Sequence, residues 1–515
     1  MKFITKTILT GVVALANPLF ASLEVASVFT DHMVLQRDLP VPVWGRADAN
    51  ERVAVAIAGQ QQVAVAGADG RWSLSLDPLA GSFEPTTMTV SAGGGDEVVL
   101  EDVLVGEVWI CSGQSNMQMA VNAVPEMKEL AAGAKGNGKE KGKGIRCFEV
   151  ERSVAFEEQE RCGGKWVDGP PNSAVAFGFA HFLQQDAKVP VGIILTCWGS
   201  SGIEAWMPRD MVETVPHFKT LMEDFDKDRE TRDKIQAILD GPRPWKGKDD
   251  VFLRRQINVL YNAMMAPLAP VAARGMVWYQ GERNTQSMHG MVDQPWFARN
   301  SGMLKYADTL KEWIKRYRKA WGRDDFEVLV VMLPGYGKTL PGGPKGGPES
   351  PVAHSWAWLR ESQLKALELP HVAVANTIDL GDVKNVHPKD KLPVARRLAL
   401  LAARDTLGVM VEAEGPVMEQ VEARGNALRV RFEHADGLKT SDGEPPSGFW
   451  IAEDTDHWVP ADAEIRGEAV VLKAAEMAAP RYVRYAFAGK PKVNLVNGAG
   501  LPAVPFRNDP FVPAN

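Results

Sequence analysis

The sequence predicts an α/β domain flanked by two all-β modules, and two patterns indicate this fold class. From about residue 103 to 406, short continuous apolar runs alternate with segments of helical periodicity, which is typical of a parallel sheet covered by helices. On both sides of that region, short runs alternate apolar and polar residues and are separated by turn residues, as in antiparallel β structure. We therefore expect three structural modules.

Length and composition limit the class of protein. A chain of 515 residues exceeds what one hydrophobic core usually serves, so several domains are expected. Hydrophobic residues at 45% and charged residues at 24% are ordinary for a globular protein and exclude wholesale disorder. The net charge of −7 offers no basic excess for a phosphate backbone, so nucleic acid is not an expected partner. The oligomeric state stays open.

Residues 1–22 resemble a signal peptide. Lys2 and Lys6 form a basic start, an apolar run follows over 8–16, and Pro18 ends it. The run is too short to span a bilayer, and no later run reaches the roughly 20 apolar residues that a span needs. An ordinary buried helix is the alternative. We expect a cleaved signal and an exported protein, periplasmic or extracellular, without a membrane span.

The mature chain is expected to divide into a β module over 23–100, an α/β domain over 101–408 and a second β module over 409–515. Within the α/β domain, apolar runs predict strands at 103–111, 191–198, 275–280, 327–333 and 371–378. Helical periodicity predicts helices near 173–187, 219–239, 251–265, 303–320, 355–368 and 392–406. Two Gly-rich segments, 133–144 and 341–351, are predicted to be inserted loops.

Polar residues suited to catalysis follow four of these strands. In "WICSGQSNMQM" (109–119), Ser115 stands at a strand-to-helix turn, where its hydroxyl and nearby N–H groups face the carboxyl edge of the sheet. Gly199 follows the next strand, and Asn284, whose amide can donate to a developing negative charge, follows the third. His387 follows the last strand, and a serine nucleophile needs such a base. Helix capping and ordinary turns are the alternatives for each residue alone.

The four segments together resemble the sialate O-acetylesterase family within the SGNH/GDSL hydrolase superfamily. The matching text is "GQSNM" (113–117), "WGSSGIEAW" (198–206), "WYQGERN" (278–284) and "HPKDK" (387–391). The resemblance implies a flavodoxin-like three-layer α/β/α domain with accessory β modules, and removal of acetyl groups from sugars by double displacement. It further implies Ser115 as nucleophile, His387 as general base, and an oxyanion hole made by the Ser115 N–H, the Gly199 N–H and the Asn284 side chain.

The third member of the catalytic triad is open, because members of the superfamily carry an aspartate shortly before the histidine and this chain has Asn385 and Lys384 there. We predict that Asp382 orients His387, with Asp379, Asn385 or a Ser–His dyad as alternatives. Four further polar residues near these motifs are candidates for substrate binding: Gln114, Gln280, Glu282 and Glu204.

The predicted mechanism needs no cofactor and no metal, since the sequence has no H-E-x-x-H, C-x-x-C or paired-histidine spacing. Cys147 and Cys162 are candidates for a disulfide in an oxidising compartment. The expected substrate is an O-acetylated sugar, with O-acetylated sialic acid implied by the resemblance and fragments of xylan or xyloglucan as the alternative. A carbohydrate-binding protein without catalysis, using aromatic residues such as Trp72, Trp450 and Trp458, is the rival from another class.

Overall fold

A computed structural model describes residues 23–134, 144–285, 296–338, 346–352 and 354–511. The expected signal peptide over 1–22, most of the expected loop over 133–144 and residues 341–345 of the other expected loop lie outside the described residues. In the described part of the chain, no helix has the length and apolar character needed to cross a bilayer.

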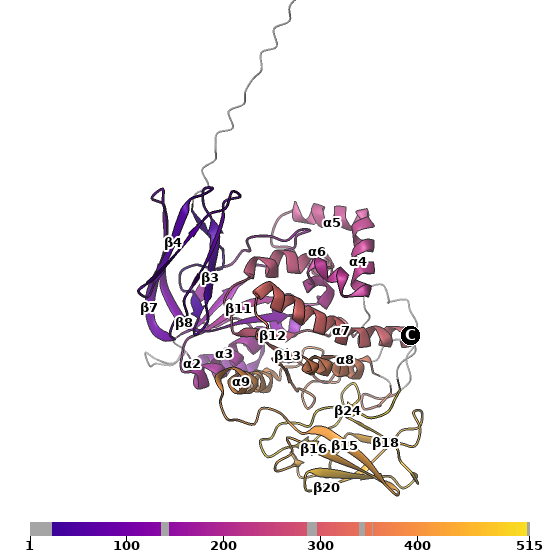
Figure 1. Ribbon diagram of the computed structural model, residues 1–515. Coiled ribbons are helices and arrows are strands. Elements are labelled where there is room, and N and C mark those ends of the chain that lie inside the picture. Colours follow the sequence, from indigo (N-terminus) through magenta and orange to yellow (C-terminus); the bar gives the residue numbers. More distant parts are fainter. Residues whose placement is uncertain (1–22, 135–143, 286–295, 339–345, 353, 512–515) are drawn as a thin grey trace, which may run out of the picture.

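The first part of the chain, drawn in indigo in Figure 1, forms one antiparallel sheet and one mixed sheet, in which a single short strand pairs parallel with its neighbour. Its strands are β1 (Glu24–Val25), β2 (Val34–Gln36), β3 (Val41–Arg46), β4 (Arg52–Ile57), β5 (Gln60–Val65), β6 (Arg71–Leu76), β7 (Ser82–Ala92) and β8 (Glu97–Gly113). Every second residue of β4 is buried, as the alternating pattern predicts for a strand with one face on a core.

Strand β8 belongs to two structures at once. Its first half pairs with β7 and β2, and its second half pairs with β11 and β12 in the central sheet. The two parts therefore form one continuous 11-stranded sheet. The expected module boundary at residue 100 falls inside this strand.

The central sheet has the order β10-β9-β11-β8-β12-β13-β14 and is parallel except for β10. Its further strands are β9 (Ile145–Glu149), β10 (Trp166–Asp168), β11 (Val191–Cys197), β12 (Gly275–Tyr279), β13 (Glu327–Val331) and β14 (Val372–Ala375). From β8 the chain first builds the side containing β9 and β11 and then crosses to β12. The carboxyl end of β8 thus lies where the order reverses, which is where ligands bind in open α/β sheets.

Helices cover both faces of this sheet (Figure 1). On one face Phe179 of α3 packs edge-on against Trp109 of β8, with ring centroids 5.2 Å apart. On the other face Trp313 of α7 packs on Trp278 of β12 at 4.4 Å. The helices are α1 (Ser115–Gln118), α2 (Pro125–Ala134), α3 (Ala174–Ala187), α4 (Pro216–Lys227), α5 (Arg229–Leu239), α6 (Gly247–Leu253), α7 (Trp296–Trp321), α8 (Ser355–Leu364) and α9 (Lys391–Leu407). Short helical turns occupy Val121–Ala123, Ile203–Trp206, Arg209–Glu213, Tyr261–Met265, Ala266–Leu268 and Lys365–Glu368.

The helices differ from the sequence prediction at several points. Helix α2 was not predicted. The predicted helix at 219–239 is two helices, because the side chain of Asp228 accepts from the Thr231 N–H and starts α5 as its N-cap. The predicted helix at 251–265 is interrupted: α6 ends at Leu253, Asn258 adopts the left-handed conformation at φ 64°, and helical backbone resumes at Tyr261–Met265. Apolar periodicity alone does not reveal such a break.

The last part of the chain forms short antiparallel sheets, drawn in yellow in Figure 1. The strands are β15 (Val417–Arg424), β16 (Ala427–Glu433), β17 (Lys439–Thr440), β18 (Phe449–Ala452), β19 (Val459–Pro460), β20 (Asp462–Arg466), β21 (Ala469–Lys473), β22 (Tyr482–Tyr485), β23 (Leu495–Val496) and β24 (Phe506–Arg507). Their apolar residues form a second core, which also takes in Met332 and Ile378 from the central domain.

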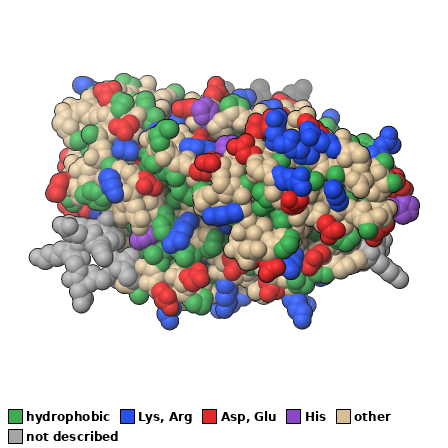
Figure 2. Space-filling view, turned by 90° about the horizontal axis from the view of Figure 1, so that it is seen from below, with side chains coloured by type: hydrophobic (Ala, Val, Ile, Leu, Met, Phe, Trp, Pro, Cys, Tyr) green, Lys and Arg blue, Asp and Glu red, His purple; other side chains and the backbone are tan. Residues whose placement is uncertain are grey.

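The surface carries side chains of both charges, and the cysteines are free thiols. Figure 2 shows basic and acidic side chains interspersed over the face seen from below, with hydrophobic side chains scattered between them. All four cysteines lie in the described residues as free thiols, so Cys147 and Cys162 are not paired in this structure.

Candidate active site

Ser115 follows the carboxyl end of β8, at the point where the strand order reverses. The turn depends on Gly113, whose φ is 135°. A Cβ at this position would lie 2.1 Å from the carbonyl oxygen of Tyr279 on β12. Glycine therefore lets the two strands approach while the chain turns into α1. Because α1 is a single turn of four residues, individual N–H groups rather than a long helix dipole face the site.

The structure brings the predicted nucleophile and base together. His387, in the loop after β14, places Nε2 2.8 Å from Ser115 Oγ. Partial burial of the ring, assisted by the positive charge of Lys391, lowers the pKa of His387 below its ordinary value. The imidazole is therefore neutral near pH 7 and can accept the serine proton.

The loop that carries His387 is held by backbone contacts. Asp382 Oδ1 accepts from the N–H groups of Lys384 and Asn385, each at 2.7 Å. Asn385 in turn accepts from the His387 N–H at 3.0 Å and donates to its carbonyl at 2.9 Å. The carboxylate of Asp379 pairs with Arg397 at 2.7 Å. Asp382 thus contacts the backbone that leads to His387, and direct orientation of the ring by this carboxylate stays a prediction.

One predicted oxyanion donor, Gly199, lies beside Ser115. A Cβ built on Gly199 would be 3.2 Å from the Cβ of Ser115 and 3.5 Å from its Cα. The Gly199 N–H donates to Oε1 of Gln118 at 2.8 Å. Asn284 is held at both ends of its amide: Oδ1 accepts from Gln280 at 2.8 Å, and Nδ2 donates to Glu204 at 2.8 Å.

The four substrate-binding candidates form a buried layer beneath these groups. Gln114, Gln280, Glu282 and Glu204 are each at most 5% exposed. Gln114 Oε1 accepts from Gln280 at 3.3 Å, and Tyr306 donates to Gln280 Oε1 at 2.8 Å. Burial raises the pKa of Glu204. Gln280 and Glu204 in turn contact Asn284, so this network holds Asn284 in place, whereas a direct contact with substrate stays a prediction for all four residues.

Three further residues contact the site and were not predicted from the sequence. Asn116 donates to Glu282 and, at 3.0 Å, to the Val386 carbonyl, which immediately precedes His387. Lys391 is fully buried and donates to Asn116 Oδ1 at 2.7 Å. Burial lowers the pKa of Lys391 to about 8 and raises that of Glu282 to about 7. Asn116 and Lys391 lie within the matching segments "GQSNM" and "HPKDK", but the sequence of these segments does not show that the two side chains are buried. Gln118, the third, is marked in the sequence only by its closeness to Ser115.

The functional groups at the site are the hydroxyl, imidazole, amide, carboxylate and ammonium groups of its side chains. Within the described ranges, no group of three or more His, Cys, Asp or Glu side chains is arranged to hold a metal ion. The arrangement can activate a hydroxyl nucleophile with a neutral imidazole and offer N–H donors to an oxyanion.

Comparison with known proteins places the chain in a family. No family model matches it. Sialate O-acetylesterase of Rattus norvegicus is 26% identical over 489 residues, covering 85% of this chain and 84% of the relative. The Homo sapiens protein of that name is 26% identical over 478 residues, covering 85% and 82%. A carbohydrate acetylesterase from Xanthomonas citri, known as a crystal structure, is 31% identical with a TM-score of 0.78 and covers 95% of this chain and 100% of its own. The chain therefore belongs to the sialate O-acetylesterase family of carbohydrate acetylesterases and is an esterase.

Proposed function

We propose that this esterase removes O-acetyl groups from sugars, with Ser115 as nucleophile and His387 as general base. The observation that carries the proposal is the 2.8 Å contact between His387 Nε2 and Ser115 Oγ at the carboxyl end of β8. The names of its relatives support an acetylated carbohydrate as the substrate.

The reaction proceeds by double displacement. His387 takes the proton of Ser115 as Oγ attacks the acetyl carbonyl, and the oxyanion is stabilised by the N–H groups of Ser115 and Gly199 and by the Asn284 amide. His387 returns the proton to the sugar oxygen, which leaves as an alcohol. A water molecule, deprotonated by His387, then attacks the acetyl-enzyme. His387 passes that proton to Ser115 Oγ as acetate leaves, which restores free Ser115.

Supporting residues act through these groups. We assign Asp382 to the third position of the triad, where it would orient the His387 ring; its carboxylate accepts from the Asn385 N–H, and the Asn385 side chain accepts from the His387 N–H. Gln280 and Glu204 orient Asn284, and Glu282 holds Asn116. Direct contact of these side chains with the sugar remains the alternative role.

The proposal also includes the type of fold and the export of the protein. Helices on both faces of a mostly parallel sheet, with the nucleophile at its reversal point, support a flavodoxin-like three-layer domain of the SGNH type. The accessory β modules over 23–100 and 409–515 flank that domain. The character of residues 1–22 supports export to the periplasm or beyond.

The decisive experiment replaces the nucleophile. Ser115→Ala should lower kcat for acetate release from 4-nitrophenyl acetate by about a millionfold with the fold intact. The matched control is Ser112→Ala, three residues earlier in β8, whose buried hydroxyl contacts no hydrogen-bond partner in the described structure. If Ser115→Ala keeps one tenth of the wild-type rate, Ser115 is not the nucleophile. Wild-type protein that releases no acetate would instead favour a carbohydrate-binding protein.

A further inference from the structure

The side chain of Asn116 links the two segments that carry the proposed nucleophile and base. Asn116 directly follows Ser115, and its Nδ2 donates to the Val386 carbonyl at 3.0 Å. Val386 directly precedes His387, whose Nε2 lies 2.8 Å from Ser115 Oγ. These two hydrogen bonds, together with the peptide bonds that join each pair of neighbouring residues, close a ring. The bond from Asn116 therefore helps to set the distance between base and nucleophile.

Lys391, the first residue of α9, fixes the orientation of the Asn116 amide. Its ammonium group donates to Asn116 Oδ1 at 2.7 Å. An ammonium group can only donate, so the amide oxygen must face Lys391 and the amide nitrogen must face Val386. Asn116 Nδ2 also donates to the carboxylate of Glu282, so both hydrogens of the amide have acceptors. In a flipped amide, Nδ2 would face the ammonium group and Oδ1 would face a carbonyl and a carboxylate, and all of these contacts would be repulsive.

The imidazole ring depends on the backbone of its loop for its position. Among the described residues, the only hydrogen bond of the His387 ring is the one to Ser115. Asp382 and Asn385 contact the backbone of the same loop. Of the side chains that hold this loop, Asn116 is the one that lies on the turn of the nucleophile itself.

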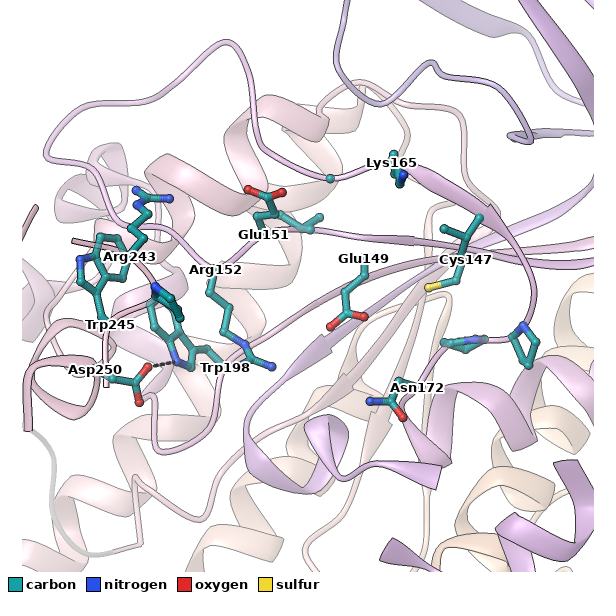
Figure 3. Close-up of a pocket in the computed structure, with 16 residues that line it drawn as sticks. Cys147, Glu149, Glu151, Arg152, Lys165, Asn172, Trp198, Arg243, Trp245 and Asp250 are labelled. Carbon is teal, nitrogen blue, oxygen red and sulfur yellow. Dashed lines mark hydrogen bonds between the residues drawn. The ribbon is translucent and has the colours of Figure 1, made fainter. Parts of the chain in front are cut away.

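Asn116 is not placed to contact a substrate. Its side chain is 0% exposed. The large cleft in Figure 3, with a volume of about 870 Å³, is lined by other residues, among them Glu149, Arg152 and Trp198. An effect of Asn116 on the reaction must therefore pass through the groups that it holds.

We propose that Asn116 is a positioning residue of the esterase reaction, which holds His387 against Ser115 through the carbonyl of Val386. Lys391 assists by keeping the amide in the orientation that can donate. This role rests on the proposed function, because it takes Ser115 as the nucleophile and His387 as the general base. Both half-reactions use His387, so loss of the bond should lower kcat and leave KM unchanged.

The test exchanges an amide and a carboxylate in the full chain, by combining Asn116→Asp with Glu282→Gln. The new carboxylate still accepts from Lys391, and the new amide can donate to that carboxylate, so the charge of the cluster is kept and the donor to Val386 is lost. We expect kcat on 4-nitrophenyl acetate to fall about 100-fold, the cost of displacing a reacting group by about 1 Å, with KM unchanged. The acid limb of the pH profile should stay in place, which separates a lost position from a changed pKa of His387.

Asn494→Asp is the matched control. Asn494, in the C-terminal part of the chain, is 6% exposed and also donates to a carbonyl and a carboxylate, those of Pro445 at 3.0 Å and Asp442 at 2.8 Å. This substitution makes the same chemical change away from the active site. It should therefore leave kcat unchanged even where it lowers the midpoint of urea unfolding. If the double variant does not fold, Asn116→Ala removes the same donor without adding a charge, and the same loss of kcat is expected.

Three results would overturn the role of Asn116. These are a kcat within about threefold of the wild type in the folded variant, a rise in KM without a fall in kcat, or an equal fall in kcat for Asn494→Asp. Acetate release that does not depend on Ser115 would instead overturn the proposed function, and Ser115→Ala tests that separately.

Discussion

At the residue scale, the side chain of Gln118 occupies the Gly199 N–H, which we propose as an oxyanion donor. Its Oε1 accepts from the Gly199 N–H at 2.8 Å, where the oxyanion is expected to bind. Gln118→Ala removes this competitor, whose net hydrogen bond is worth about 0.5–1.5 kcal/mol. We expect kcat/KM on 4-nitrophenyl acetate to rise about 2- to 10-fold, as measured by initial rates. A fall in kcat/KM would instead assign Gln118 to holding Gly199 or the substrate.

The protonation of His387 sets the acid limb of the pH profile. The base must be neutral, and its pKa is lowered by burial and by the nearby Lys391 ammonium, so kcat/KM should fall tenfold per pH unit only below about 6.5. Lys391→Met removes the positive charge and should move this limb to higher pH, whereas Lys391→Arg should not. Glu282 and Asp390 also act on Lys391, so the limb rather than the absolute rate is the measurement. A limb that stays in place or moves to lower pH in Lys391→Met would contradict this account.

At the element scale, the turn between β8 and α1 depends on one glycine. Gly113→Ala would place Cβ 2.1 Å from the Tyr279 carbonyl at a φ of 135°, which combines a clash with an unfavourable conformation. We expect a loss of at least about 2 kcal/mol in the free energy of unfolding in urea and a large loss of kcat. Gly59→Ala is the matched control, since Gly59 has a φ of 80° but no atom within 4 Å of its Cβ position, so only the strain of about 1 kcal/mol applies. Equal costs for the two variants would show that the clash is relieved.

At the scale of the whole molecule, Arg360 of α8 joins the C-terminal sheets to the central domain. It is 1% exposed, and its guanidinium donates to the carbonyls of Leu333, Pro334, Ala488 and Gly489 at 2.6–3.1 Å. Arg360→Met leaves the carbonyls of Leu333 and Ala488 without this donor, whereas the carbonyls of Pro334 and Gly489 still accept from Trp356 Nε1 and from the Tyr336 N–H. We expect a loss of roughly 2–4 kcal/mol in the free energy of unfolding, part of it offset by removal of a buried charge. Arg466→Met, which breaks an exposed pair with Glu464, should change it by less than about 0.5 kcal/mol. A similar small change for Arg360→Met would show that other contacts hold the sheets together.

The amino-acid pattern was enough to predict most of the central strands and the residues that follow them. Continuous apolar runs mark β11, β12 and β13 because strands buried on both faces carry mostly apolar side chains, and Ser115, Gly199, Asn284 and His387 follow strands, where parallel ends meet. How those residues are held depends on the folded chain. The contacts of Asn116 with Val386, of Gln118 with Gly199 and of Asp382 with the backbone of Asn385 depend on side-chain direction and on burial. Two of these three contacts join residues at least 80 positions apart, and the cleft beside Trp198 likewise arises from segments that meet only in the folded chain. Local periodicity does not predict such long-range contacts, because they depend on the packing of whole elements.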